Sequence, residues 1–281
     1  MKKIYFFLTY TFVLFCFISN SWGQVGIQSS SPKGALDIGS TTTGLVYPVV
    51  SLLDIYNETI NNPNGANIIA GTTVYNNNTV DGITGVYPGL YVWNGTVWVP
   101  QFEKKDNKLY TQSASVRTDS EPLLPLDGNQ TISFPSYTFT PKFTGYYKVL
   151  VTVHYGAGRA DLPPSSQYVN FVAAEGVFNF TFNSTTSSFT VKAYSGNNDD
   201  RLFDNGTRKE YNNKFNQTSF VRQDLLSAGT NYTFSLTFNQ ASAPGIEGNG
   251  NVTVIPAGDG RGYIILNNDL KCTIEFNYVG E

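Results

Sequence analysis

The chain has 281 residues, with 18 Lys and Arg against 21 Asp and Glu, and a net charge of -3. Only 14% of its residues are charged and 15% are aromatic, whereas soluble domains average roughly 25% charged residues. The aromatic content argues against a disordered chain, and the charge balance argues against a nucleic-acid-binding protein, which needs a basic surface. Since long helix-forming runs are also missing, the composition favours a β-rich protein.

Residues 1–23 have the pattern of a secretory signal peptide. Lys2 and Lys3 precede an apolar run over residues 4–18, and small residues near position 23 favour cleavage before Gln24. The run is shorter than the roughly 20 residues that a membrane span needs, and no later segment resembles a span. We therefore expect export through a signal peptide and a mature chain without a transmembrane segment.

The N-terminal part of the mature chain, residues 24–102, is rich in Gly, Asn, Thr and Val and has few charges. We interpret it as a β-rich stalk or attachment module. Its strongest local pattern is the run 90–99, in which Asn94 and Gly95 separate two alternating segments, as in a tight β-hairpin. The charge cluster at residues 103–108 follows, and we predict a solvated linker and domain boundary there.

The predicted hairpin carries three large aromatic residues. With a two-residue turn, Trp93 faces Thr96 across the hairpin, and Tyr91 and Trp98 lie on the same face as that pair. Tyr91, Trp93 and Trp98 then form an aromatic plate, which is a candidate ligand-binding site for stacking a sugar. The alternative, which we favour, is a face packed against the next domain or a neighbouring subunit.

Residues 109–281 form a succession of short alternating runs separated by turn residues, with Gly176 as an expected break or bulge. The segment 219–227 could instead form one helical turn. Eight or more strands at this spacing indicate an all-β antiparallel sandwich or barrel. The predicted strands span residues 146–155, 168–182, 188–194, 217–226, 232–238, 252–255, 263–266 and 270–279.

Two segments of this region resemble motifs of the tumour necrosis factor-like, or complement-type, globular heads. Residues 139–147 are similar to the "F-T-x-P-x-x-G-x-Y" entry to a central strand, and residues 223–232 to the "L-x-x-G-D-x-V" turn, with Thr230 in place of the usual Asp. The resemblance implies an antiparallel jelly-roll head over residues 109–281. It also implies a homo-trimer that binds partners at its apex or in the grooves between subunits.

The first zone resembles the N-terminal segment of many exported surface proteins of Bacteroidota-type bacteria, which are often likened to tail-fibre-like modules. The likeness covers residues 24–99 and includes the segments 24–27, 35–38, 43–48, 71–76 and 89–95 in order. It implies a stalk or attachment role and a location at the cell surface or outer membrane, or in the extracellular medium.

Few residues suit catalysis. His154 is the only histidine and Cys272 the only cysteine of the mature chain, and more than a hundred residues separate them. A triad, a Cys-His pair or a zinc site would depend on these two residues. Since Cys272 alternates with Ile274 and Phe276 in a strand pattern, we predict a buried apolar role for it, with a reactive thiol as the alternative. We predict no catalytic residue.

Acidic residues gather in one loop, at Asp199, Asp200 and Asp204. An oxygen-rich loop of this kind suits calcium, although its spacing does not match an EF-hand, and we favour the alternative of a solvated loop. No other cofactor is expected.

The function that we expect is adhesion or ligand or glycan binding by a non-enzymatic, exported, trimeric head. The alternative is a structural subunit of a surface fibre or of a motility or secretion apparatus. A glycan-active enzyme with paired carboxylates is less favoured.

Overall fold

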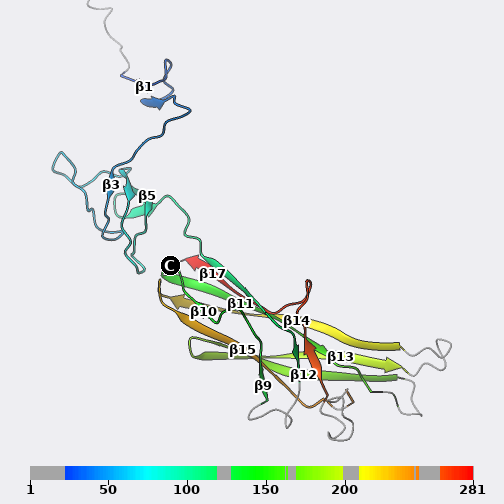
Figure 1. Ribbon diagram of the computed structural model, residues 1–281. Coiled ribbons are helices and arrows are strands. Elements are labelled where there is room, and N and C mark those ends of the chain that lie inside the picture. Colours follow the sequence, from blue (N-terminus) through cyan, green and yellow to red (C-terminus); the bar gives the residue numbers. More distant parts are fainter. Residues whose placement is uncertain are drawn as a thin grey trace, which may run out of the picture. The chain divides into compact units, whose positions relative to one another are not determined.

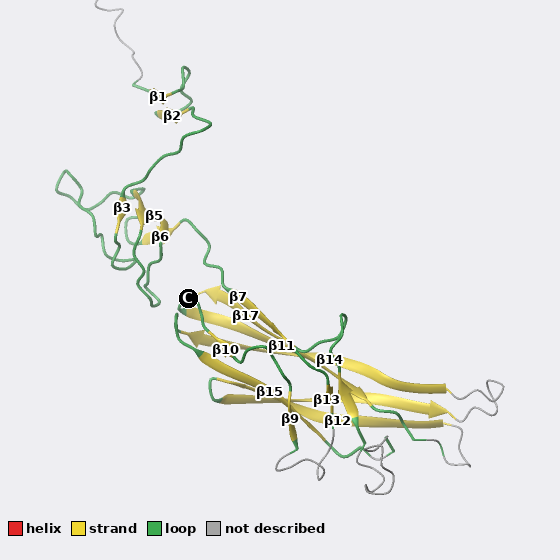
Figure 2. Cartoon of the chain, viewed as in Figure 1, coloured by secondary structure: helices red, strands yellow, loops and turns green. Residues whose placement is uncertain are grey.

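The structure is a computed structural model that describes residues 23–118, 128–161, 163, 169–198, 209–243, 245–246 and 260–280, without the side chains of residues 209–213. In these ranges the chain forms strands and loops and contains no helix (Figure 2). It divides into two compact units, Met1–Pro48 and Val49–Glu281. The predicted all-β class is confirmed.

The first unit contains one small sheet. Strand β1 (Val25–Ile27) pairs in parallel with β2 (Leu36–Ile38), and β1 is exposed along its whole length. The Asp37 carboxylate accepts hydrogen bonds from the Ser29 hydroxyl (2.9 Å) and the Lys33 backbone N–H (3.0 Å). Two strands of three residues bury too little apolar surface to be stable by themselves.

A second small sheet opens the larger unit. Its strands are β3 (Val49–Val50), β4 (Thr73–Asn76), β5 (Gly89–Trp93) and β6 (Trp98–Pro100), in that order. The buried Asn76 side chain organises the loops around the sheet. Its Oδ1 accepts a hydrogen bond from the Leu52 N–H (2.9 Å), and its Nδ2 donates to the carbonyls of Asn78 (2.8 Å) and Tyr87 (2.9 Å).

The remaining strands form one large antiparallel sheet (Figure 1). They are β7 (Asn107–Thr111), β8 (Val116–Arg117), β9 (Asn129–Thr131), β10 (Thr138–Phe139), β11 (Gly145–Ala157), β12 (Val169–Phe182), β13 (Thr185–Asn198), β14 (Lys209–Leu226), β15 (Tyr232–Gln240), β16 (Gly262–Ile264) and β17 (Thr273–Gly280).

The predicted strands of this region correspond to β11 to β17, apart from residues 252–255, which lie outside the described residues. The alternative of a helical turn at 219–227 is wrong, because β14 continues in strand geometry to Leu226. An Asn183-Ser184 turn that the sequence patterns did not reveal joins β12 to β13. Both turn residues have positive φ, 47° and 63°, as the tightest hairpin turns require.

The large sheet curls into two layers that pack face to face. One layer has the order β7-β17-β11-β14, the other contains β15, β12 and β13, and the pairing of β13 with β14 joins them. Inward-facing rings meet between the layers, with centroids 5.2 Å apart for Phe182 and Phe276 and 4.7 Å apart for Tyr155 and Phe238. This arrangement confirms the predicted jelly-roll sandwich.

Gly176 does not interrupt β12, contrary to the predicted break or bulge. Its register is regular on both sides, with Val191 of β13 and Gln240 of β15 as partners. The reason for a glycine is packing against a core ring of the neighbouring strand β15. A Cβ atom at position 176 would lie 2.2 Å from Cζ of Phe238, so any larger residue would displace that buried ring.

The charge cluster at residues 103–108 is partly bound to the sandwich. Asn107 and Lys108 belong to β7. The Asp106 carboxylate accepts hydrogen bonds from the Tyr147 hydroxyl (2.7 Å) and the Lys142 backbone N–H (2.8 Å). The more exposed Glu103 forms an ion pair with Lys105 (2.7 Å). The boundary between an attachment module and a head at these residues stays a prediction.

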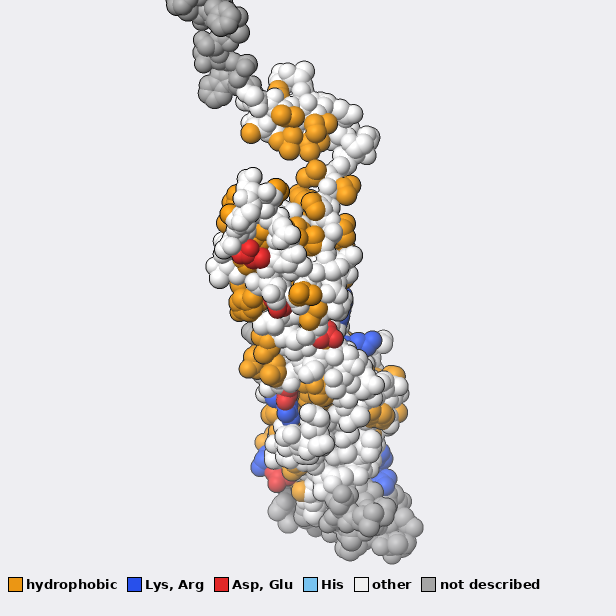
Figure 3. All heavy atoms as spheres, turned by 90° about the vertical axis from the view of Figure 1, so that its left-hand side faces the viewer, with side chains coloured by type: hydrophobic (Ala, Val, Ile, Leu, Met, Phe, Trp, Pro, Cys, Tyr) orange, Lys and Arg blue, Asp and Glu red, His pale blue; other side chains and the backbone are white. Residues whose placement is uncertain are grey.

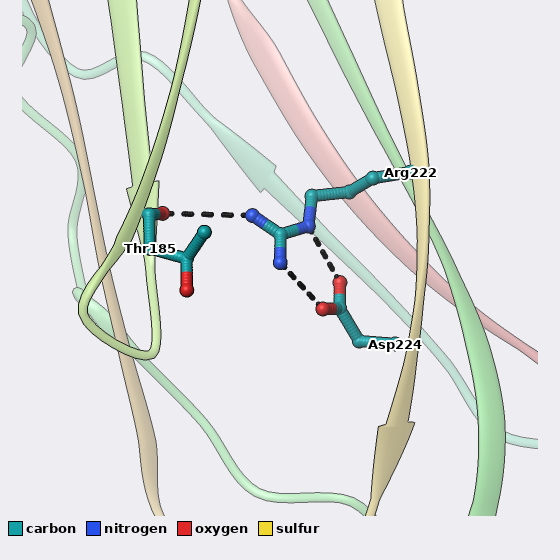
Figure 4. A network of polar contacts seen from close by, with 3 residues as sticks. All are labelled: Thr185, Arg222 and Asp224. Atoms are coloured by element: carbon teal, nitrogen blue, oxygen red, sulfur yellow. Dashed lines mark hydrogen bonds and ion pairs between the residues drawn. The ribbon is translucent and has the colours of Figure 1, made fainter.

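A polar clamp ties β14 to the hairpin that joins β12 and β13 (Figure 4). Arg222 Nε and Nη2 donate to the two carboxylate oxygens of Asp224 at 2.7 and 2.5 Å, and Nη1 donates to the Thr185 carbonyl at 3.5 Å. The guanidinium also lies 5.8 Å from the centroid of the Phe182 ring. Both charged side chains are more than 80% buried, so solvent screens the clamp only partly.

We expect the substitution Arg222→Met to lower the free energy of unfolding by about 1.5–3 kcal/mol, because it leaves the Asp224 carboxylate mostly buried without its charged partner. Urea denaturation at a fixed protein concentration measures the change. Lys192→Met is the matched control, since its ion pair with Glu175 is largely exposed, and we expect little or no effect. Equal losses in the two variants would contradict the role assigned to the clamp.

Candidate functional site

The layer β7-β17-β11-β14 presents apolar side chains on its outer side. Residues opposite one another in neighbouring strands share a face, and the pairs Tyr146–Leu225 and Leu150–Val221 join β11 to β14. Leu109 of β7 lies in the same row as Leu150, since both pair with Glu275 of β17. We call Leu109, Tyr146, Leu150, Val221 and Leu225 the assembly face.

The assembly face is open to solvent in the single chain. Leu109, Val221 and Leu225 are more than half exposed and Tyr146 is 42% exposed, while Tyr147, next to Tyr146, is fully buried in the core. The row between Tyr146 and Leu150 contains Lys148, Gln223 and Asn277, and Glu275 lies between Leu109 and Leu150 in their own row. An apolar face with a few neutral and charged side chains is typical of a protein interface.

Tyr91, Trp93 and Trp98 occupy the core of the small sheet. Each ring is 3% exposed or less, and Trp98 donates its indole N–H to the Asn57 carbonyl (2.8 Å). The three side chains share a face, as predicted, but they pack on Leu52, Val74 and Val86 from the same sheet and its loops. They are therefore not a sugar-stacking plate in this chain, nor a face left for a neighbouring domain or subunit.

The predicted register of this hairpin is wrong. Trp93 pairs with Trp98 and not with Thr96, because the turn is longer than two residues. The Asn94 side chain accepts hydrogen bonds from the N–H groups of Thr96 (2.9 Å) and Val97 (2.8 Å). Asparagine side chains commonly close turns in this way.

No metal site is found in the described ranges, where no three His, Cys, Asp or Glu side chains gather to hold an ion. Asp199, Asp200 and Asp204, the candidate calcium ligands, lie outside the described residues, so that hypothesis stays a prediction. A cavity of about 330 Å³ beside the small sheet is lined by Glu58 and several asparagines of residues 61–67. Its single carboxylate is a weak basis for a cation site.

His154 and Cys272 lie together, although 118 residues separate them. The Cys272 Sγ atom is 3.9 Å from His154 Nδ1, and both residues are at most 1% exposed. The antiparallel pairing of β11 with β17 brings the two segments side by side. Sequence spacing therefore gave a misleading reason to reject a Cys-His pair.

Burial keeps both groups neutral. It raises the pKa of the Cys272 thiol to about 12, and it lowers the pKa of the His154 imidazole, against a smaller opposing effect of the Ile265 backbone. His154 Nε2 has no hydrogen-bond partner. A protonated thiol shielded from solvent is a poor nucleophile, so the predicted buried, apolar role of Cys272 is confirmed.

The described residues contain no helix long and apolar enough to cross a membrane. Hydrophobic side chains, orange in Figure 3, reach the surface of the first unit and of the small sheet among few charged ones. In the first unit they include Val25, Ile27, Leu36, Leu45 and Val46, all at least half exposed.

Residues 25–115 match a family model described as "Phage tail like trimerisation region". The matched region runs from β1 through β7. It confirms the predicted likeness of the N-terminal zone to tail-fibre-like modules. No curated protein matches the chain.

The solved structures that are similar to the chain include the following two. A tumour necrosis factor of S. frugiperda, Eiger, is 11% identical with a TM-score of 0.30, over 64% of this chain and 95% of that one. A structure of infectious bursal disease virus, strain Gx, is 12% identical with a TM-score of 0.16, over 73% of this chain and 46% of that one. The fold assignment rests on the strand order of the sandwich itself.

We expect the free energy of unfolding to fall as the pH is lowered from 7 to 5.5. The folded state keeps His154 neutral, whereas the unfolded chain binds a proton below about pH 6.5, so protonation favours unfolding, by at most about 1.4 kcal/mol per pH unit. Urea denaturation across this range measures the slope. His154→Gln is expected to remove it, and an unchanged slope in this variant would show that another group is responsible.

Proposed function

We propose that this protein is an exported, non-enzymatic surface protein that assembles as a homo-trimer and uses its jelly-roll head for adhesion. The observation that carries the proposal is the match of residues 25–115 to a trimerisation region.

The first unit needs a partner to be stable. Its paired strands have three residues each, and its apolar side chains are exposed in the single chain. Covering such side chains with those of two other copies removes roughly 25 cal/mol of unfavourable free energy for each square ångström taken from water. Trimerisation therefore supplies the core that the single chain lacks.

The assembly face supports the same conclusion for the head. Leu109 lies in β7, which is inside the matched region, and it stands in the same row as Leu150 and Val221, with Glu275 of β17 between Leu109 and Leu150. Three copies related by a threefold axis could bury these faces against one another, as closed symmetric oligomers do.

Binding rather than catalysis is supported by the chemistry of the described residues. The one Cys-His pair is buried and neutral. An exported adhesive protein also suits the predicted signal peptide, although residues 1–22 lie outside the described part of the chain.

The trimer is tested by the mass of the purified mature protein in solution. We expect three chains per particle at micromolar concentration by light scattering, and conversion to a smaller species in the variant Val221→Asp. The new carboxylate would be buried without a partner in the middle of the assembly face, at a cost of several kcal/mol per chain.

Thr190→Asp is the matched control, because it adds the same charge to an exposed position on the outer side of the other layer. We expect it to remain trimeric. A wild-type protein that is monomeric at these concentrations would contradict the trimer, and a trimeric Val221→Asp variant would contradict the use of this face.

Export is tested on the cells that make the protein. We expect the mature chain in the surface or extracellular fraction, with Gln24 as the first residue detected by mass spectrometry of N-terminal peptides. Recovery of the intact N-terminus from the cytoplasm would contradict export.

The likeness to a phage tail region also supports the second candidate, a subunit of a surface fibre. Electron microscopy and attachment assays of cells that lack the protein distinguish the adhesin from the fibre subunit. Loss of a visible appendage with unchanged attachment to surfaces favours the fibre, and loss of attachment alone favours the adhesin.

A further inference from the structure

The layer opposite the assembly face has a polar outer side. Outward side chains of β13 and β15 are mostly Ser, Thr and Asn, and several bond to one another or to Asn179 and Thr181 of β12. The outer side of β12 also contains Ala173, Val177 and the exposed Val169. The hydroxyls of Thr181 and Thr186 are 2.8 Å apart, and Ser188 donates to Asn179 at 2.7 Å. Such a surface is well hydrated and offers no reason for an exposed aromatic residue.

Two aromatic rings nevertheless stand on this face. Phe171 of β12 is 69% exposed and Tyr194 of β13 is 43% exposed. Their rings are nearly parallel, with an interplanar angle of 6° and centroids 5.7 Å apart. Between β12 and β13 the residues directly opposite them are small, since Phe171 pairs with Gly196 and Tyr194 with Ala173. On its other side Tyr194 pairs with Lys214 of β14, and both aromatic side chains remain open to solvent.

An ion pair borders the rings. Lys192 is the next outward residue after Tyr194 along β13, and it pairs with Glu175, which follows Ala173 on the outer side of β12; their charged atoms are 2.8 Å apart. Both side chains remain about half exposed. The pair offers hydrogen-bond donors and acceptors with nearly cancelled charge, which suits the hydroxyl groups of a neutral ligand.

The size of the patch decides between a protein and a small ligand. The two rings together expose roughly 220 Å², taking about 200 Å² for a whole aromatic side chain. A stable protein interface needs about 800 Å² from each partner. One sugar ring, by contrast, has an apolar face of C–H groups that fits on an aromatic ring and a rim of hydroxyls that needs hydrogen bonds.

We infer that Phe171 and Tyr194 form a carbohydrate-binding platform that stacks a pyranose ring, with Glu175 and Lys192 binding its hydroxyls. This inference rests on the proposed adhesive function and names the ligand class and the site. The platform lies on the layer opposite the assembly face, so assembly through that face leaves it open. Three weak sites on one particle bind a polysaccharide far more tightly than one site does.

The test uses the mature protein on an array of plant, algal, fungal and animal-type glycans, followed by native gel electrophoresis in the presence of the polysaccharide that binds best. We expect the double variant Phe171→Ala/Tyr194→Ala to lose at least tenfold in apparent affinity. Glu175→Gln is expected to weaken binding less, because the amide keeps an acceptor and adds a donor.

Tyr75→Ala is the matched control, because Tyr75 is an equally exposed tyrosine of the small sheet, 43% exposed, and it should bind like the wild type. Light scattering of the same samples measures the number of chains per particle, so a loss of glycan binding can be told apart from a loss of the trimer. A trimeric wild type that binds no glycan, or a trimeric double variant that binds as well as the wild type, overturns the platform and leaves the assembly standing.

Discussion

Aromatic packing between the two layers is the interaction on which the head depends. Phe276 of β17 lies at its centre, with ring centroids 4.2 Å from Phe139, 5.2 Å from Phe182 and 5.8 Å from Phe234. With a single cysteine predicted in the mature chain, no intramolecular disulfide reinforces the sandwich. The burial of these rings therefore replaces the covalent bridges found in many small exported domains.

The two layers use the alternation of strand residues in opposite ways. Each turns one set of side chains to the shared core, but the outward set of β11 and β14 includes four large apolar residues, whereas that of β13 and β15 is mostly hydroxyl- or amide-bearing. The same fold thus provides one surface suited to contact with sister chains and another suited to water. The exposed Phe171 and Tyr194 are the departure from this second rule.

Strands could be predicted from the sequence where one face is buried, because the period of two is then plain, as in β11 and β15. Turn geometry was less predictable. Asn94 forms a side-chain-closed turn in place of a tight Asn-Gly turn, and this changes the partner of Trp93. The sequence also could not show that the aromatic side chains of that hairpin pack into a separate core of the small sheet. Periodicity identifies which residues share a face, but not what covers that face.

Contacts between segments that are far apart in the sequence could not be predicted from local sequence patterns. The approach of His154 to Cys272 follows from the register of β11 with β17, and local sequence carries no information on register between strands that are far apart. Likewise, nothing in the runs that contain Phe171 and Tyr194 distinguishes an exposed pair of rings from a buried one. Both features required the arrangement of strands in space.

The place of β17 has a consequence for how the chain is made. This strand fills the gap between β7 and β11, and its partners Leu109 and Leu150 precede Glu275 by well over a hundred residues. Until the ribosome has added β17, the layer has an open slot and Phe276 is missing from the centre of the core. The sandwich therefore cannot be completed before β17 has been synthesised, and its folding depends on contacts between segments that are far apart in the sequence, which slows folding.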